Sequence, residues 1–451
     1  MKSRLKVDLL NENTNKGLFL FALPMILCNL LQQLYNIADT VIVGRVGGAN
    51  ALAAVGAAYS LMTFLTSVVI GLCMGSGAVF SYYVGKKDDK KLKECVQTSF
   101  VLIGAIAIVL CIVVQALINP ILHLLQIPSE IYSMMYSYTF IVVWGIIFIF
   151  LYNYFAFTLR AVGNSVVPLF FLGVTSVLNI VLDLVFVMVF NWSLEGAAIA
   201  TVISQAISGV GLGLYTWIKE PLFRFSLKEF MQGDKPYKEI LNLSVISSAQ
   251  QSVMNFGILM VQGLVNSFGA CVMTAFAASV KIDTFAYMPA QEFGNAYSIY
   301  VSQNYGAGKD ERIKEGTKSA MKASVFFCMI ISIIVFVFAE NLMMIFVKPE
   351  ETEVIRIGIQ YLRIEGTFYA LIGILFLLYG YFRGMNKPAV SLVLTVISLG
   401  TRVALAYMLS SIHVIGVNGI WLSIPIGWFL ADSLGLYLLI RNIRSKKCIK
   451  I

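Results

Sequence analysis

Long apolar stretches alternate with short polar segments along the whole chain. Twelve of them run for about 20 residues or more, at roughly 18–43, 53–83, 96–118, 131–157, 166–190, 196–218, 241–266, 274–303, 322–346, 354–382, 389–411 and 418–441. A helix of that length spans the hydrocarbon core of a bilayer and satisfies its own backbone amides there. Transmembrane strands would instead alternate in polarity over about ten residues. The pattern therefore predicts an all-α integral membrane protein with twelve transmembrane helices.

The second half of the chain repeats the first. GKKDDKKLKE at 85–94 returns as GAGKDERIKE at 306–315, an offset of 221 residues. Each half contains six predicted helices, and an even number gives both halves the same orientation in the membrane. We therefore predict two pseudo-symmetric six-helix bundles: an N-lobe at 1–218, a cytoplasmic linker at 219–240 and a C-lobe at 241–451. Doubling of this kind is typical of transporters, with the substrate site between the halves.

Composition and charge agree with this topology. Hydrophobic residues make up 59% of the chain and charged residues 13%, about half of what a soluble protein carries. The segments on one side of the predicted membrane hold 26 of the 33 Lys and Arg residues, which places that side and both termini in the cytoplasm. The net charge of +9 follows from this arrangement, so we expect no nucleic-acid partner.

Two acids lie inside predicted helices of the first half, where an ionisable side chain is costly. Asp39 is 21 residues into the helix at 18–43, and Asp183 is 17 residues into the helix at 166–190. At 1.5 Å per residue both lie in the outer half of the bilayer, about 31 and 26 Å from the inner face. Thr201 and Tyr138 lie at similar levels on helices that run in the opposite direction. The sequence thus allows all four side chains to converge.

Each acid also ends a polar stripe along one helix face, which we expect to point toward the protein interior and not toward lipid. The stripes are Gln32, Asn36 and Asp39 in one helix, and Thr175, Asn179 and Asp183 in the other. Two neighbouring carboxylates in a low dielectric do not both stay ionised cheaply. We therefore expect one of them to hold a proton, or both to share a monovalent cation such as Na⁺, as in a coupling-ion site. The alternative is that either acid only hydrogen-bonds between helices.

The second half has a different polar set. Gln251 and Asn255 share a face of the helix at 241–266, and Glu292 and Asn295 lie one turn apart on the helix at 274–303. With Glu365 on the helix at 354–382, they are candidates for a substrate cavity or for gating. For four other charged residues we expect interfacial snorkelling or pairing; these are Lys281, Asp283, Arg356 and Arg363. An ion pair between Arg402 and Glu365 would be structural.

Several segments resemble the multidrug and toxic compound extrusion (MATE) family of the MOP flippase superfamily. They are LPMILCNLLQQLYNIADTVIVGRVGGANALAAVG at 23–56, RAVGNSVVP at 160–168, LNIVLDLVFV at 178–187, EGAAIAT at 195–201 and SQNYGAGKDERIKEG at 302–316. The resemblance implies the twelve-helix MATE fold in a prokaryotic plasma membrane. It also implies antiport of organic cations or drugs against H⁺ or Na⁺ by rocker-switch alternating access.

The resemblance also points to particular residues. It implies coupling-ion roles for Asp39, Asn179, Asp183, Thr201 and Tyr138, with Na⁺ as one ion that the first four could hold. It suggests Gln33 and Asn153 as substrate-cavity positions, to which Asn36 of the polar stripe is added. The branch of the family whose sodium site uses acids on the seventh and tenth helices is matched poorly, because the helix at 241–266 has no carboxylate.

Two other classes of function fit the sequence less well. A flippase for lipid-linked saccharides has the same superfamily fold, but it would need a strongly cationic cavity and often additional helices. A membrane-embedded enzyme would need a nucleophile–base pair or a metal-ligand cluster, and an ATP-driven pump would need a phosphate-binding loop; the sequence shows none of these. We therefore expect a transporter and not an enzyme. We further expect a monomer with no cofactor beyond the coupling H⁺ or Na⁺, whose partners are small cationic substrates and membrane lipid.

Overall fold

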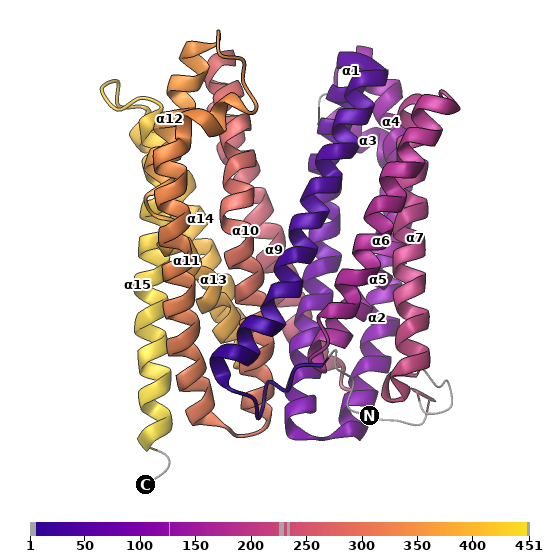
Figure 1. The fold of residues 1–451 in the computed structure, drawn as a ribbon, viewed down its shortest axis with the longest axis vertical. Coiled ribbons are helices and arrows are strands. Elements are labelled where there is room, and N and C mark those ends of the chain that lie inside the picture. The colour runs from indigo at the N-terminus through magenta and orange to yellow at the C-terminus, as the bar shows by residue number, and fades with distance from the viewer. Residues whose placement is uncertain (1–5, 126, 225–229, 232–234, 449–451) are drawn as a thin grey trace. The chain divides into compact units, whose positions relative to one another are not determined.

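The computed structural model describes residues 6–125, 127–224, 230–231 and 235–448. Within these ranges every regular element is a helix (Figure 1). The first half forms α1 (Thr14–Lys86), α2 (Asp89–Ala116), α3 (Ile118–Leu124), α4 (Ser129–Val143), α5 (Gly145–Ala161), α6 (Val166–Asp183), the π-helical η1 (Leu184–Val189) and α7 (Ser193–Lys219). The second half forms the short η2 (Pro221–Phe223), α9 (Tyr237–Asn266), α10 (Ala270–Gly306), α11 (Asp310–Met344), α12 (Thr352–Gly366), α13 (Tyr369–Gly384), α14 (Pro388–Ser410) and α15 (Asn418–Cys448).

The helices agree with the predicted spans. Among the described residues, nine helical segments are long and apolar enough to cross a membrane, and the pair α12 and α13, bent by 51°, makes a tenth. The two remaining predicted spans are α9 and α10, which form as helices but carry many polar side chains. The long element α1 contains two spans, because its backbone is not helical at Gly48, where φ is 72° and ψ is −169°. Glycine adopts this positive φ without steric cost.

The chain divides into two compact units. Unit 1 contains Leu27–Gln251 and the N-terminal residues up to Asp8, whereas unit 2 contains Leu9–Ile26 and Ser252–Ile451. The units differ from the predicted lobes in two places. Residues 9–26 belong with unit 2, and the first part of α9 and the described part of the predicted linker at 219–240 belong with unit 1. Residues 225–229 and 232–234 of that linker lie outside the described residues.

In unit 1, the second part of α1 lies very close to the first part of α9. A Cβ built on Gly71 would lie 2.4 Å from Ser248 Cα, and one built on Gly75 would lie 2.5 Å from both Leu243 O and Ser244 Cα. Ser76 Oγ and Ser244 Oγ are 2.8 Å apart and hydrogen-bonded. Small residues at these positions therefore allow the two backbones to touch, as in other membrane helix pairs.

In unit 2, α10 packs against α11 and α13, and α14 packs against α15 (Figure 1). The turn between α10 and α11 holds the N-terminal segment. Asn304 Nδ2 donates to Leu9 O at 3.2 Å, and Arg312 Nη2 donates to Leu9 O at 3.2 Å and to Glu12 O at 2.8 Å. Part of the repeated motif at 306–315 thus serves as an anchor for residues 9–12.

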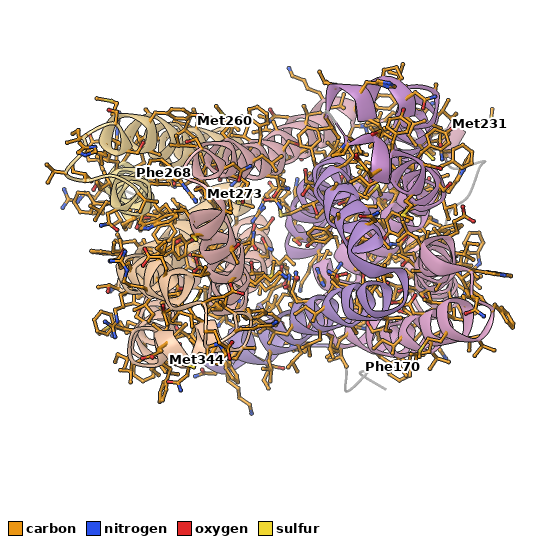
Figure 2. The ribbon with its side chains drawn as sticks, turned by 90° about the horizontal axis from the view of Figure 1, so that it is seen from above. Phe170, Met231, Met260, Phe268, Met273 and Met344 are labelled. Carbon is orange, nitrogen blue, oxygen red and sulfur yellow. The ribbon has the colours of Figure 1, made fainter. Side chains whose placement is uncertain are left out.

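Large apolar side chains cover much of the outer surface of both units. Phe170 of unit 1 is 66% exposed and Met344 of unit 2 is 40% exposed (Figure 2). Soluble proteins seldom expose apolar surface in large contiguous patches. Side chains of this kind fit the hydrocarbon core of a bilayer, as the predicted topology requires.

Candidate coupling-ion site

The polar stripe of α6 is buried within unit 1. Thr175, Asn179 and Asp183 are 4%, 3% and 0% exposed, whereas Phe170, Val174 and Val177 on the same helix are exposed. Spacing of one turn places the three polar residues on one helix face. The expectation that the polar stripe faces inward is therefore confirmed for α6, whereas on α1 Gln32 is exposed and Asn36 and Asp39 are half-buried.

A change of helix type begins directly after Asp183. The α-helix ends at this residue, and η1 continues as a π-helix from Leu184 to Val189. Short π-helical turns are rare in proteins overall, and those that occur are often found at functional sites. Nothing in the apolar sequence LVFVMV indicated this feature in advance.

Asp39 of α1 and Asp183 of α6 are brought together with two tyrosines. The two carboxyl groups interact electrostatically with each other, and Tyr35 and Tyr138 both interact with Asp39 and with Asp183. Tyr138 on α4 is buried, at 7% exposed. The depth calculation from the sequence allowed Asp39, Asp183 and Tyr138 to converge, and the structure brings the three side chains together. It missed Tyr35, which is one helical turn before Asp39 and could have been found from that spacing.

Several polar atoms of the two acids and of Asn179 are buried and lack hydrogen-bond partners in the described part of the chain. Among the described residues, Asp39 Oδ1, both carboxyl oxygens of Asp183 and both amide atoms of Asn179 have none. A buried polar group without a partner costs about 1–3 kcal/mol, and more when it is charged. The geometry thus provides acceptors for a proton or for a small cation, the chemistry that hard, oxygen-binding ions prefer. We call Asp39, Asp183, Asn179, Tyr35 and Tyr138 the Asp39–Asp183 site.

Thr201 and the three N-lobe cavity candidates are less directly placed. Thr201 is half-buried on α7, which packs against α4, α5 and α6, but no hydrogen bond joins it to the acids in the described residues. Gln33 and Asn36 are half-buried on α1. Asn153 Nδ2 donates to Ile149 O of its own helix at 2.9 Å, so that part of its amide is already occupied.

The candidates on α9 and α10 are half-buried in the structure. Gln251 and Asn255 lie on α9, one on each side of the boundary between the units. Glu292 Oε1 accepts a hydrogen bond from Asn295 Nδ2 at 3.2 Å, and Asn295 Oδ1 accepts one from Arg383 Nη2 at 3.0 Å. Glu292 therefore belongs to a network that contains the buried Arg383, 91 residues further along the chain, and no sequence pattern links the two.

Asp283 differs from its sequence-based interpretation. We expected an interfacial or paired residue, but its side chain is 2% exposed within unit 2. Its carboxylate accepts hydrogen bonds from the Tyr361 hydroxyl at 2.6 Å and from the Tyr369 hydroxyl. The prediction failed because both partners come from distant helices that depth along α10 does not reveal. In contrast, Lys281 and Arg363 lie over the rings of Phe346 and Phe336, and Arg356 pairs with Glu353 at 2.7 Å, as expected for interfacial residues.

Glu365 adjoins the same cluster. It is 3% exposed and interacts electrostatically with Arg402, which is 9% exposed. Their proximity agrees with the structural pairing considered for them.

A further buried acid, on α15, is not among the residues predicted from the sequence. Asp432 on α15 is 3% exposed, and neither of its carboxyl oxygens has a hydrogen-bond partner among the described residues. As the sole acid in the stretch at 418–441, it gave a clear signal.

Comparison with known proteins agrees with this fold. The MatE family model matches residues 24–185 and 244–408, one segment in each half. The chain is 30% identical over 441 residues to the probable multidrug resistance protein YpnP of Bacillus subtilis, covering 97% of both chains. It is 26% identical to the probable multidrug resistance protein NorM of Thermotoga maritima, covering 90% of this chain and 88% of the relative.

Solved structures show the same architecture. A MOP superfamily transporter from Pyrococcus furiosus superposes with a TM-score of 0.93 at 22% identity, covering 99% of this chain and 100% of that one. An outward-facing multidrug resistance MATE family transporter superposes with a TM-score of 0.92 at 22% identity, covering 99% of both chains. The predicted twelve-helix fold is thereby confirmed. With a family match in both halves and relatives along nearly its whole length, the chain belongs to the MatE family of membrane transporters.

Proposed function

We propose that this protein exports organic cations, drugs among them, in exchange for H⁺ or Na⁺. The observation that carries the proposal is the Asp39–Asp183 site, where Asp39 Oδ1 and both carboxyl oxygens of the neighbouring Asp183 are buried without hydrogen-bond partners among the described residues. No ion pair with a described Lys, Arg or His neutralises either acid. Two such groups are stable in a membrane only when a proton or a monovalent cation compensates their charge.

The coupling follows from charge competition. When the coupling ion is absent, the site is negative and favours a cationic substrate in the same lobe. When H⁺ or Na⁺ binds, the charge is neutralised and the attraction for the substrate falls. An ion that binds one conformation more tightly shifts the population toward it, and rocking of the two halves would then expose the substrate to the other side. The names of the similar proteins, which are multidrug resistance proteins, support a drug-like substrate.

The proposed setting is the plasma membrane of a prokaryotic cell, with both termini in the cytoplasm and the protein acting as a monomer. The excess of Lys and Arg in the segments on one side supports this orientation. A cysteine-accessibility experiment on intact cells, with single reporter cysteines at Glu130 and at Lys90, tests it directly. We expect an impermeant thiol reagent to label the first position and not the second.

Efflux from proteoliposomes tests the coupling. The purified protein is reconstituted, and ethidium efflux is followed under an imposed pH gradient and, separately, under an imposed Na⁺ gradient. We expect one gradient to drive efflux in the wild type, and the double variant Asp39→Asn/Asp183→Asn to show only the leak of protein-free liposomes. Glu130→Gln, which neutralises an exposed acid of unit 1, is the matched control and should retain full efflux. Unchanged coupled transport in the double variant would remove the basis of the proposal.

Two further variants distinguish the coupling ion. If Na⁺ couples transport, Asn179→Ala and Thr201→Ala remove neutral oxygen ligands and should raise the Na⁺ concentration required for half-maximal efflux. If H⁺ couples transport, both variants should keep the wild-type response to the pH gradient and show no response to Na⁺.

A further inference from the structure

A groove opens along the surface of unit 2 at one end of α11. Its volume is about 990 Å³, and it is lined by Asn15 and Phe19 of α1, Phe293 of α10, and Lys318, Lys322 and Phe326 of α11. All of these residues belong to unit 2. The groove belongs to unit 2 and the Asp39–Asp183 site to unit 1, and the proposed function does not use the groove.

The α11 wall of the groove has charge at one end and apolar surface at the other. Lys318, Lys322, Phe326 and Met329 are all exposed, with Phe326 at 68% and Met329 at 54%. Their spacing of four, four and three residues places them on one helix face. Lys322 is also the first residue of the apolar stretch at 322–346. The two lysines therefore lie at the level of the lipid head groups, and the phenylalanine and methionine lie at the level of the acyl chains.

No acid in the described part of the chain neutralises either lysine. Among the described residues, no carboxylate forms an ion pair with Lys318 or Lys322. Glu311, an acid earlier on the same helix, already forms an ion pair with Lys314, with a distance of 2.6 Å between Lys314 Nζ and Glu311 Oε1. The two ammonium groups thus stand at the edge of an apolar groove with their charge uncompensated, which favours an anionic ligand with an apolar part.

The internal repeat shows that the scaffold does not require these charges. At the offset of 221 residues, Gln97 and Val101 of the first half correspond to Lys318 and Lys322. The equivalent helix, α2, therefore folds without a cation at either position. The pair of lysines is a property of unit 2 alone, beyond what topology demands of a helix end.

We propose that this groove binds one anionic phospholipid of the adjacent leaflet. Its phosphate lies between Lys318 and Lys322, within reach of the Asn15 side-chain amide, and one acyl chain follows Phe19, Phe326 and Met329 into the membrane. Basic residues at the membrane surface attract anionic head groups, and basic pockets between transmembrane helices hold them. The apolar lower wall adds selectivity for a lipid over a free phosphate.

Native mass spectrometry of the detergent-solubilised protein tests the proposal. Phosphatidylglycerol and phosphatidylcholine with identical acyl chains are titrated in parallel. We expect phosphatidylglycerol to bind at one saturable site and phosphatidylcholine to bind far more weakly. At about fivefold in affinity for each lysine, Lys318→Gln/Lys322→Gln should weaken phosphatidylglycerol binding by about 25-fold. Lys90→Gln/Lys238→Gln removes two exposed lysines that do not line the groove and should leave it unchanged.

Further measurements identify the ligand and control for misfolding of the variants. Inorganic phosphate and water-soluble glycerophosphoglycerol should not compete at concentrations where the lipid saturates the site, and competition by either overturns the assignment to a lipid. Equal binding of the two lipids, or full binding by the double glutamine variant, also overturns it. Lys318→Arg/Lys322→Arg should restore binding. In the wild type, phosphatidylglycerol should slow hydrogen exchange in residues 14–20 and 314–326, and protection confined to other segments contradicts the proposed location.

Discussion

Gly75→Ala tests how tightly unit 1 is assembled. Gly75 lies on α1 where that helix touches α9, and the added Cβ would meet Leu243 O and Ser244 Cα, each at 2.5 Å. Both are backbone atoms, so no side-chain rotation can relieve the clash. An ordinary contact of this type needs at least 3.4 Å, and the two helices must therefore separate by about 1 Å.

The expected loss of stability has two parts. Overpacking of a close contact costs about 1–3 kcal/mol. Separation of the helices also stretches the hydrogen bond of 2.8 Å between Ser76 and Ser244, and an interhelical hydrogen bond in a membrane protein contributes about 0.6 kcal/mol. We therefore expect Gly75→Ala to destabilise the protein by about 2–4 kcal/mol, mostly through the backbone clash.

Thermal unfolding in detergent, followed by circular dichroism and by tryptophan fluorescence, measures the change. Gly56→Ala is the control, because Gly56 lies on the same helix and a Cβ there would meet no heavy atom within 4 Å. That substitution should be neutral or should stabilise the helix by up to about 1 kcal/mol. Equal melting temperatures for Gly75→Ala and Gly56→Ala would show that α1 and α9 do not touch as described.

Three further substitutions probe other contacts. Tyr361→Phe removes a hydrogen bond of 2.6 Å to the buried Asp283 carboxylate and should lower the free energy of unfolding by about 1.5–3 kcal/mol. Thermal unfolding measures this loss, and the control Tyr437→Phe, at an exposed position, should have no effect. Gly163→Ala places a Cβ 2.3 Å from Val7 O at a residue whose φ is 83°, so it should lower the free energy of unfolding by at least about 1–2 kcal/mol. It should also speed hydrogen exchange of the Val7 amide, which in the wild type donates to Gly163 O, and exchange at the wild-type rate would contradict this. Arg312→Met removes the donors to Leu9 O and Glu12 O and should expose residues 9–13 to proteolysis, whereas Lys314→Met, whose ion pair is within its own helix, should not.

Much of the fold follows from the sequence because the membrane leaves few alternatives. Apolar stretches of bilayer length become helices, and each predicted span corresponds to a helix or a helix pair in the structure. The bends in the helices are harder to predict from the sequence. The stretch at 354–382 reads as one helix, yet α12 and α13 meet at 51°, and α6 turns into a π-helix at Leu184. Both features depend on packing against neighbouring helices, which hydropathy along one segment does not contain.

The same distinction applies to the sites. Helical rise predicts one level for Asp39, Asp183 and Tyr138, because each depth is counted from a membrane boundary, and in the structure the three side chains interact. Asp283 was misjudged because its environment is made by Tyr361 and Tyr369, which lie 78 and 86 residues away in sequence. Depth gives the level of a residue in the bilayer, but only the tertiary structure gives the helix that it faces. The ion-coupling role of Asp39 and Asp183 stays a prediction that the efflux experiment tests.

The division of the chain into units bears on how such a protein could arise. Residues 9–26 come from the first half and pack in unit 2, whereas the start of α9 comes from the second half and packs in unit 1. Neither repeat is therefore self-sufficient. An ancestral half-length chain would have lacked these contacts as a single molecule, and could have made them by exchanging the equivalent segments with a second copy, as domain-swapped dimers do. Fusion of two such copies into one chain would then have turned an association that depends on concentration into one that does not.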